Sequence, residues 1–481
     1  MMIAQYLKPT LFRTIGFCII FSITTVGAAF AHIRLPNIFG SNMVLQQKSE
    51  ISFWGLGNPT EKIFITASWD NKTDSVVTDG NAQWKIKLQT PPAGGPYMIT
   101  LKGDNTITLS NIMIGEVWVC SGQSNMEWSS YQKLPQILEE MPYSANNDLR
   151  LFQVPRSTSQ YPQDNIEGVW KISGPEALDG FSAVGYFFAK ELQKKLNVPV
   201  GIINASWGGT PAETWAPAEV VTTNDVLTRS AALQNQTPWW PVKPGYAYNS
   251  MIAPLTPFSI AGVIWYQGEG NTVMPFTYNQ LFSAMITSWR NAWKKEFPFY
   301  YVQIAPFKYG NYNMGNLIRE QQTQTLSLPN TGMVVITDLV NDVKNIHPIN
   351  KTDVAKRLAA YALAETYQQD LGIYKSPMFK RMEINGSKAS LYFDNAPNGF
   401  TLKTGKAATE FFIAGADKVF VPATIKIEKD KLVASNPEVK SPVAVRFSFS
   451  NEAISNIFSK EGLPVAPFRT DDWEVDTGKV K

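Results

Sequence analysis

Between residues 109 and 375, short apolar runs alternate with helical patterns, and this alternation constrains the fold more than any other feature of the sequence. The apolar runs are candidate strands and occupy residues 117–120, 200–204, 263–266, 300–304 and 333–337. They are almost entirely apolar, as expected for strands that are buried on both faces of a sheet. Residues 184–196, 278–293 and 354–363 carry apolar side chains at helical spacing. The region therefore predicts an α/β domain with a parallel sheet and crossover helices.

The sequence on either side of this region has β character. Residues 32–108 contain short alternating runs bounded by turn residues, at 51–54, 62–67, 84–88 and 97–101. Residues 376–481 contain similar runs at 389–393, 411–413, 418–421 and 443–449. Runs of this length and spacing are typical of β-sandwiches and jelly rolls. We therefore expect an N-terminal β-sandwich or jelly roll at 32–108, the α/β domain at 109–375 and a C-terminal β domain at 376–481.

The first 31 residues have the pattern of a secretory signal peptide. Lys8 and Arg13 provide a positive start, residues 15–26 are apolar, and Ala29-Phe30-Ala31 offers the small residues of a cleavage site. An uncleaved membrane anchor is the alternative, although the apolar run is short for a membrane span. Cleavage after Ala31 would place the protein in the periplasm or outside the cell.

Removing 31 of the 481 residues would leave 450 residues with one cysteine, Cys120, because Cys18 lies in the signal. No intramolecular disulfide could then form, so the fold would depend on its core. Loss of Lys8 and Arg13 would lower the formal net charge from +3 to +1. A charge this close to zero gives no electrostatic reason to expect binding to nucleic acid or to an anionic membrane.

A serine stands at the end of the first predicted strand of the α/β region. The run 117–120 leads directly into Gly122-Gln123-Ser124-Asn125. In open α/β sheets, ligands bind at the carboxyl ends of the strands. Ser124 is therefore placed as a nucleophile would be, on a rigid element that is open to substrate. The alternative is that Ser124 caps the helix that follows, since serine favours that position.

Histidine is so scarce that it restricts the choice of a base for this serine. The chain has two histidines, His32 and His347. A serine nucleophile usually passes its proton to a neighbouring histidine. His32 would lie almost at the new N-terminus after cleavage, where chains are poorly ordered. A Ser–His pair would therefore join Ser124 to His347.

The acid that would orient His347 is less well defined by the sequence. A carboxylate in this role fixes the imidazole tautomer and stabilises the imidazolium. Asp342 lies five residues before His347 and Asp338 nine residues before it. We favour Asp342, with Asp338 or a backbone carbonyl as the alternatives.

Candidate oxyanion donors follow two other predicted strands. Gly208 and Gly209 come after the run 200–204, and paired glycines allow backbone N–H groups to approach a ligand closely. Gln267 and Asn271 follow the run 263–266 as amide donors, with Glu269 between them as a candidate buried carboxylate. Acyl transfer requires such donors for the developing oxyanion. A tight strand-to-helix turn is the alternative explanation for the paired glycines.

Metal and nucleotide chemistry find little support. One usable histidine and one cysteine cannot form a zinc site of ordinary composition. The sequence has no Gly-x-Gly-x-x-Gly and no phosphate-loop pattern. We therefore expect no metal and no organic cofactor, and the sequence gives no indication of the oligomeric state.

Four ordered blocks together resemble the signature blocks of sialate O-acetylesterases, which belong to the wider SGNH (GDSL-like) hydrolases. The blocks are 122–126, 207–210, 265–269 and 346–348, and the similarity extends to 35–47 and 467–473. The resemblance implies a three-layer α/β/α hydrolase domain with Ser124 as nucleophile and His347 as base. It also implies an oxyanion hole formed by the backbone at Ser124, Gly208 or Gly209, and Gln267.

The chain departs from the family pattern at two places. Gly270 stands where family members often carry Ser or Ala. Asn345 and Lys344 stand where many members place Asp two or three residues before the histidine. A Ser–His dyad is therefore an alternative to a triad.

These observations predict an exported serine esterase that removes O-acetyl groups from sugars, with sialic acid as the expected substrate. Acetylated xylan or another acetylated glycan is the alternative substrate, and a non-catalytic carbohydrate-binding protein is the alternative of a different class. Residues 225–249 are expected to form an inserted loop over the catalytic face. Further candidates for substrate contact are Gln123, Asn125, Glu269, Asn271, Trp239 and Trp240, with Trp128 and Trp215 as other possible stacking walls.

Overall fold

The computed structural model describes residues 32–310 and 312–478. The predicted signal peptide, residues 1–31, lies outside the described residues. Over the described ranges, no helix is long and apolar enough to cross a membrane. The same part of the chain contains no cluster of three or more His, Cys, Asp or Glu side chains that could hold a metal ion.

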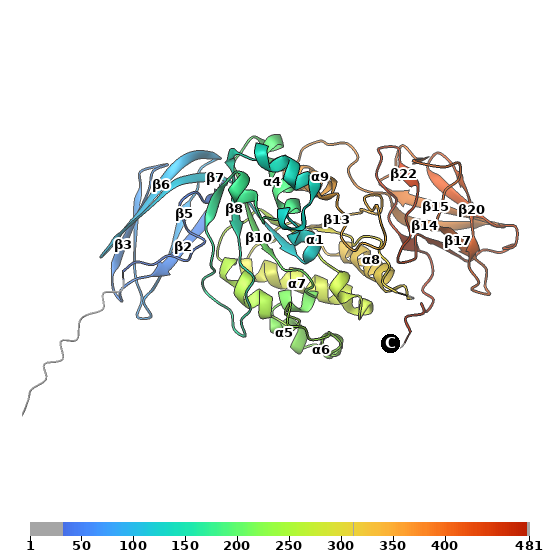
Figure 1. Ribbon diagram of the computed structural model, residues 1–481, viewed down its shortest axis with the longest axis horizontal. Helices are drawn as coiled ribbons and strands as arrows, with labels where there is room; N and C mark the ends of the chain where they lie inside the picture. Colours follow the sequence, from blue (N-terminus) through green and yellow to red (C-terminus); the bar gives the residue numbers. More distant parts are fainter. Residues whose placement is uncertain (1–31, 311, 479–481) are drawn as a thin grey trace, which may run out of the picture.

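A mostly parallel sheet forms the centre of the molecule (Figure 1). Its strand order is β13-β12-β11-β7-β10-β8-β9, and only β9 at the edge pairs in the antiparallel sense. The strands are β7 Thr106–Gly122, β8 Asn146–Gln153, β9 Trp170–Ser173, β10 Val200–Ser206, β11 Gly262–Tyr266, β12 Phe299–Val302 and β13 Thr331–Val334. The predicted parallel sheet is confirmed, and all five predicted runs contribute strands to it.

The sequence pattern missed β8 and β9. In β8 the apolar run is interrupted by Arg150, which is 1% exposed and whose guanidinium donates to the backbone carbonyls of Asn147 and Leu149. A buried arginine that bonds to its own strand hides a strand from a hydrophobicity pattern.

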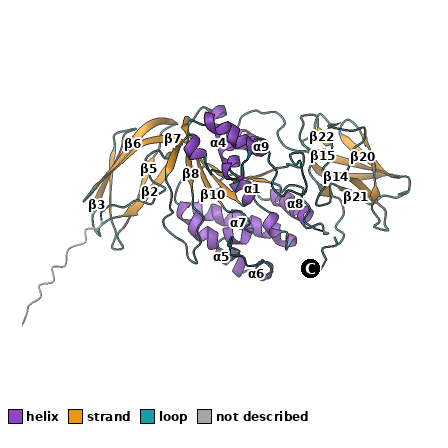
Figure 2. Ribbon diagram, viewed as in Figure 1, coloured by secondary structure: helices purple, strands orange, loops and turns teal. Residues whose placement is uncertain are grey.

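Helices cover both faces of this sheet (Figure 2). One face packs against α4 Ala183–Leu196 and α9 Lys351–Tyr361, and Trp118 and Cys120 point into that core. The opposite core, which contains Val117 and Val119, packs against the second set of helices. That set includes α5 Ala218–Thr222, α6 Asp225–Ala232, α7 Tyr278–Trp293 and α8 Met314–Gln324. The three-layer α/β/α class is therefore confirmed, and α6 occupies the first part of the segment 225–249 that we expected to be a loop.

The long strand β7 connects the N-terminal β region to the central sheet. Its first half pairs with β6 and β1, and its second half pairs with β10 and β11. It therefore runs through the boundary that we place between residues 108 and 109. The N-terminal strands are β1 Val44–Gln46, β2 Glu50–Leu56, β3 Lys62–Ala67, β4 Thr73–Val77, β5 Gln83–Gln89 and β6 Gly94–Lys102.

The C-terminal region forms a separate group of antiparallel strands at the other end of the molecule (Figure 1). Its two larger sheets have the orders β14-β15-β20-β19 and β18-β17-β21-β23, and a third sheet pairs β16 with β22. The strands are β14 Met378–Asn385, β15 Lys388–Asp394, β16 Phe400–Leu402, β17 Phe411–Ala414, β18 Val421–Pro422, β19 Thr424–Ile427, β20 Lys431–Ser435, β21 Ala444–Phe447, β22 Ile457–Ser459 and β23 Phe468–Arg469. Of the predicted run 418–421, only Val421 lies in a strand.

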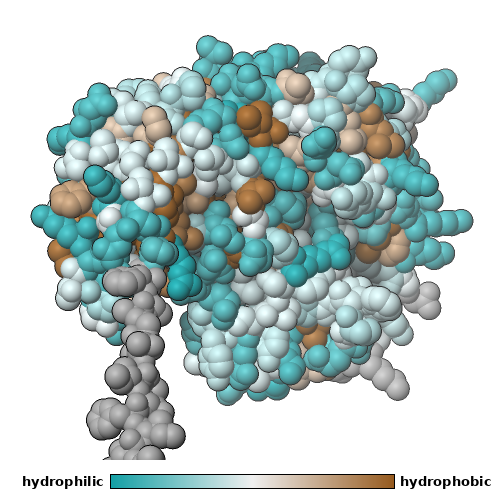
Figure 3. Space-filling view, turned by 60° about the vertical axis from the view of Figure 1, so that its left-hand side comes forward, coloured by the Kyte–Doolittle hydropathy of each residue, from teal (hydrophilic) through white to brown (hydrophobic). Residues whose placement is uncertain are grey.

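One face of the molecule is mainly hydrophilic (Figure 3). On the face seen in Figure 3, hydrophobic residues form small scattered patches among hydrophilic ones. This face therefore presents no broad apolar surface to a partner.

Candidate active site

Ser124 lies where β7 turns into a short helix, α1 Ser124–Glu127. The turn requires glycine at position 122, because its φ is +134° and a Cβ there would collide with the backbone carbonyl of Tyr266 on β11. Ser124 is half-buried, and no acceptor among the described residues bonds to its backbone N–H. The sheet edge thus presents both the hydroxyl and the amide of Ser124.

His347 reaches this serine from a loop 223 residues further along the chain. The distance between its Nε2 and the Ser124 Oγ is 2.8 Å. Proton transfer from a hydroxyl requires a separation of about 2.6–3.2 Å. The structure therefore brings together Ser124 and His347, the pair expected from the scarcity of histidine in the sequence.

The imidazole is held by an aromatic ring. The ring of Trp128 stacks on His347 with centroids 4.2 Å apart and planes inclined by 23°. The backbone N–H of His347 donates to the Asn345 side chain at 3.0 Å. Burial, together with the nearby Lys351 cation, lowers the pKa of His347 to about 4. The imidazole is therefore neutral, and able to accept a proton, at neutral pH.

The structure does not bring Asp342 to His347. The Asp342 side chain is exposed and accepts the backbone N–H of Lys344 at 2.9 Å. Asp338 forms a bidentate ion pair with Arg357, with both contacts at 2.7 Å. In residues 32–310 and 312–478, no carboxylate hydrogen-bonds to the imidazole. The geometry differs from the predicted triad because the loop turns Asp342 back onto its own backbone.

A buried polar cluster lies behind the Ser–His pair. The amide of Asn125 donates to Glu269 at 2.7 Å and to the Ile346 carbonyl at 3.0 Å, and its oxygen accepts from Lys351 at 2.6 Å. All three side chains are at least nine-tenths buried. Burial lowers the pKa of Lys351 to about 7 and raises that of Glu269. Asn125 and Glu269 thus act inside the protein and tie the loop of His347 to the sheet edge.

The paired glycines lie beside Ser124 as expected, but their amides differ. The Gly208 N–H donates to the Glu127 carboxylate at 2.8 Å, whereas the Gly209 N–H has no acceptor in the described part of the chain. A Cβ at Gly208 would lie 2.9 Å from that carboxylate and 3.3 Å from the Cβ of Ser124. At Gly209, φ is +83° and the Trp240 ring fills the space that a Cβ would need. Gly208 therefore permits a close approach to Ser124, and Gly209 permits a close approach of the Trp240 ring.

Gln267 and Asn271 are bonded to each other instead of facing outward. The Gln267 amide donates to the Asn271 oxygen at 2.8 Å and to the Thr210 carbonyl at 3.3 Å, and its oxygen accepts from Tyr278 at 2.9 Å. The Asn271 amide donates to Glu213 at 2.8 Å. The expectation that Gln267 offers a free oxyanion donor is therefore wrong, because both of its N–H bonds are already used.

Of the remaining candidates for substrate contact, one is buried and one is exposed. The Gln123 oxygen accepts the backbone N–H groups of Gly268 and Gly270, at 3.3 and 3.1 Å, and it is 3% exposed. Trp239 is 74% exposed, and its carbonyl accepts from the Trp207 indole at 3.2 Å. Gln123 therefore shapes the turn, whereas Trp239 remains accessible to a ligand.

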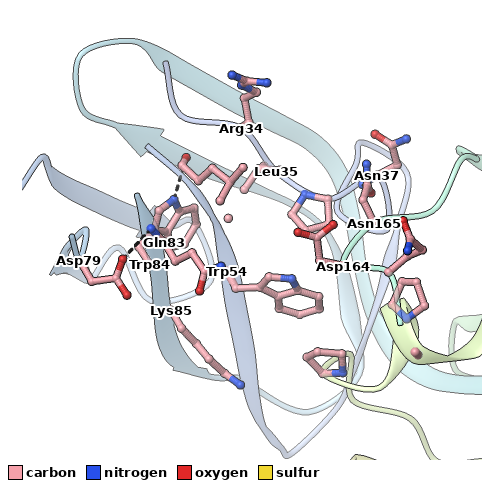
Figure 4. Close-up of a pocket in the computed structure, with 17 residues that line it drawn as sticks. Arg34, Leu35, Asn37, Trp54, Asp79, Gln83, Trp84, Lys85, Asp164 and Asn165 are labelled. Carbon is pink, nitrogen blue, oxygen red and sulfur yellow. Dashed lines mark hydrogen bonds between the residues drawn. The ribbon is translucent and has the colours of Figure 1, made fainter. Parts of the chain in front are cut away.

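Two cavities adjoin the catalytic edge. One of about 570 Å³ is lined by Glu127, Arg156 and Lys171, and one of about 280 Å³ by Trp207 and Trp240. A third cavity, of about 840 Å³, is lined mainly by the N-terminal β region, and neither Ser124 nor His347 is among its lining residues (Figure 4). It is lined by Trp54 of β2 and by the segment 253–257.

Two residues of the site, Lys351 and Glu127, were not predicted from the sequence, although the sequence contains a signal for Lys351. Lys351 is in phase with Val354 and Leu358 on the buried stripe of α9, so its charge falls at a core position. A lysine in a buried stripe indicates a special environment. Glu127 gave no such signal, because its role depends on where the glycine loop folds.

The similarity to known proteins agrees with this geometry. A family model described as "Carbohydrate esterase, sialic acid-specific acetylesterase" matches residues 114–369. The chain belongs to this family. The matched range includes Ser124, His347 and every strand of the central sheet except the start of β7. The family resemblance and the prediction of a carboxylic-ester hydrolase are thereby confirmed.

Individual relatives support the same class of enzyme. A carbohydrate acetylesterase from Xanthomonas citri, whose crystal structure is known, is 38% identical to this chain in sequence. The two structures match over 92% of this chain and all of that chain, with a TM-score of 0.84. The human sialate O-acetylesterase is 29% identical over 396 residues, which cover 74% of this chain and 76% of the relative. The rat protein of that name is 28% identical and covers 77% and 81%. The protein is therefore a carbohydrate O-acetylesterase by family.

Proposed function

We propose that the protein is an exported serine esterase that removes O-acetyl groups from sialic acids through an acetyl-enzyme on Ser124. The observation that carries this proposal is the 2.8 Å contact between Ser124 Oγ and His347 Nε2. It supports nucleophilic catalysis because a serine hydroxyl needs a base within hydrogen-bond reach.

In the first half of the reaction, Ser124 Oγ attacks the acetyl carbonyl carbon while its proton passes to His347 Nε2. The carbonyl electron pair moves to oxygen and gives a tetrahedral oxyanion. When the oxyanion collapses, the bond to the sugar oxygen breaks and His347 returns the proton to that oxygen. The sugar leaves with a free hydroxyl, and the acetyl group remains on Ser124.

In the second half, His347 takes a proton from water, whose oxygen attacks the acetyl carbonyl. The second tetrahedral intermediate releases acetate, and His347 returns the proton to Ser124. The backbone N–H groups of Ser124 and Gly209 have no acceptor among the described residues, so both can donate to the oxyanion. Each such donor contributes about 3 kcal/mol to the transition state.

Sialic acid differs from neutral sugars by its carboxylate, and a cation pair beside the site supports this substrate. Arg156 and Lys171 line the cavity of about 570 Å³ next to Glu127, and both are exposed. Arg156 also pairs with the Glu127 carboxylate at 2.6 Å, and Asp179 of the same cavity accepts from Ser130. The Lys171 ammonium has no hydrogen bond or ion pair among the described residues, so it remains available to a sialate carboxylate.

Acetate release from a substrate panel tests the proposal. The panel contains O-acetylated sialosides, acetylated xylan fragments and p-nitrophenyl acetate, with Ser124→Ala as the blank. We expect Ser124→Ala to lose activity on every substrate and Lys171→Met to raise KM on sialosides alone. Faster turnover of xylan fragments than of sialosides would replace sialic acid with a neutral glycan and leave the serine mechanism intact. Unchanged hydrolysis in Ser124→Ala would refute the mechanism itself.

Export and the three-domain division remain proposals that rest on the sequence. Cleavage after Ala31 predicts a mature protein whose N-terminal residue is His32. N-terminal sequencing of protein recovered from the periplasm or the medium checks this prediction. An intact Met1 on that protein would contradict it.

A second candidate function is carbohydrate binding by the N-terminal β region, and the large cavity favours it. Trp54 reaches into this cavity between Asp164 and the strand it comes from (Figure 4). An aromatic ring flanked by polar groups is the usual composition of a small-molecule site. We expect Trp54→Ala to weaken binding of xylohexaose or sialyllactose to the Ser124→Ala protein, while p-nitrophenyl acetate hydrolysis by Trp54→Ala stays normal. Unchanged binding of both sugars would exclude this site.

A further inference from the structure

The base His347 lacks the carboxylate partner that a triad would supply. Among the described residues, its only side-chain hydrogen bond is that to Ser124, and Asp342 and Asp338 are bonded elsewhere. A base without such a partner needs another device to fix its ring and to set its charge. Two side chains beside it, Trp128 and Lys351, have the geometry for these two tasks.

Trp128 fixes the ring. Its indole covers one face of the imidazole at 4.2 Å, and it follows directly after α1, so it moves with Ser124. Because the two rings are inclined by only 23°, the imidazole cannot tilt without losing the stack. An indole face also attracts a cation, so the contact strengthens when His347 becomes imidazolium.

Lys351 sets the charge. Its Nζ lies 5.6 Å from the centre of the Trp128 ring and 5.4 Å from that of Tyr266, and its one hydrogen bond goes to Asn125. It is 1% exposed, and no carboxylate forms an ion pair with it in the described part of the chain. A buried cation beside an imidazole disfavours a second positive charge there.

The other charged groups around His347 are weaker influences. Glu269 follows β11. Glu127 lies on α1 and is paired with Arg156 of the β8–β9 loop. Asp342 and Lys344 lie on the loop of His347 itself and are exposed. Glu269 is separated from Lys351 by the Asn125 amide, and Glu127 is paired with Arg156. Lys351 is therefore the dominant unpaired charge.

We propose that Trp128 takes over the positioning role of a triad carboxylate by stacking on the imidazole, whereas Lys351, whose charge is opposite to that of a carboxylate, keeps the imidazole unprotonated between turnovers. Both are positioning residues that act through His347. The consequence is an esterase whose base stays free in mildly acidic solution. The inference rests on the proposed function, but the pKa of His347 can be measured without any turnover.

Nuclear magnetic resonance isolates this histidine, because a His32→Gln background without a polyhistidine tag leaves His347 as the only one in the chain. We expect its pKa to be about 4 in this background. In Lys351→Gln, which keeps a donor for Asn125 but removes the charge, we expect the pKa to rise by about one unit or more. The acid limb of kcat/KM should move to higher pH by the same amount.

Lys356→Gln is the matched control, because Lys356 lies on the same helix but is exposed and paired with Asp353. It should leave both the pKa and the acid limb unchanged. Lys351→Met provides a second neutral variant if Lys351→Gln does not fold. A His347 pKa that stays the same in the folded neutral variant overturns the role of Lys351, whatever the enzyme acts on.

For Trp128, the test is a pair of substitutions. Trp128→Leu removes the aromatic face and should lower kcat by about 5- to 30-fold with little change in KM. Trp128→Phe keeps an aromatic face and should recover most of this loss. Equal rates in the leucine and phenylalanine variants overturn the stacking role, and a loss confined to KM assigns Trp128 to substrate binding instead.

Discussion

On one side of Ser124 the imidazole of His347 lies beside an aromatic ring and a buried cation, whereas on the other side the glycine loop bonds to a carboxylate. The base side contains Trp128 and Lys351. The oxyanion side contains Glu127 on the Gly208 amide, and behind it Gln267 is bonded into the interior. The difference shows that each side contains a charge opposite to the one that a triad and an oxyanion hole would place there: a cation lies beside the base, and an anion accepts from a candidate oxyanion donor.

This contrast gives the two sides different tasks. The Lys351 cation beside His347 favours the neutral form of the imidazole, which is the form that accepts a proton. The Glu127 carboxylate holds the glycine loop through the Gly208 N–H but does not itself donate to an oxyanion. The base side is thus tuned for its protonation state, and the oxyanion side for the shape of its backbone.

The largest effect is expected from removal of the base. His347→Ala leaves Ser124 without a proton acceptor, so kcat/KM for p-nitrophenyl acetate should fall by about 10²–10⁴-fold. His32→Ala is the matched control and should leave the rate unchanged. A loss below tenfold in His347→Ala would remove this histidine from the mechanism.

The pH dependence comes next and tests the character of the base side. Since only neutral imidazole accepts a proton, kcat/KM rises with pH through the pKa of His347 and levels off above it. With this pKa at about 4, most of the plateau rate should remain near pH 5. A histidine with its ordinary pKa would be neutral in only about 3% of molecules at that pH. An acid limb near pH 6.5 in the parent protein is the outcome that contradicts a cationic base side.

A smaller effect is expected on the oxyanion side. Glu127→Ala removes the acceptor of the Gly208 N–H and should lower kcat about tenfold, which corresponds to the cost of leaving one such group unpaired. Glu127→Gln keeps an acceptor oxygen, so its rate should stay within about threefold of the parent. If both substitutions cause the same loss, the negative charge matters and the hydrogen bond to Gly208 does not.

The smallest effect is expected from Asp342→Asn, because the Asp342 carboxylate bonds only to the backbone of its own loop. Acetate release should remain within about threefold of the parent rate. A loss of about a hundredfold would mean that Asp342 orients His347 during catalysis and that the reaction uses a triad.

Ser124 and His347 could be predicted because each rests on a simple property of the chain: a strand end for the serine and the scarcity of histidine for the base. The sheet could be predicted where its strands are apolar throughout. The role of Gln267 could not be predicted, because an amide after a strand can point outward or into the interior. Its inward orientation depends on the hydrogen bond from Tyr278, which the sequence does not reveal. The special environment of Lys351 could have been recognised from the sequence, since its charge falls on the buried stripe of α9.

The central claim is that the acetyl group passes through Ser124, and rapid acid quenching followed by peptide mass spectrometry tests it most directly. During turnover of an O-acetylated sugar, the account predicts one acetyl group on the peptide that contains Ser124, at that residue. The Ser124→Ala protein should show none. Acetylation at another residue, or full activity with no acetylated peptide at any quench time, would contradict the account.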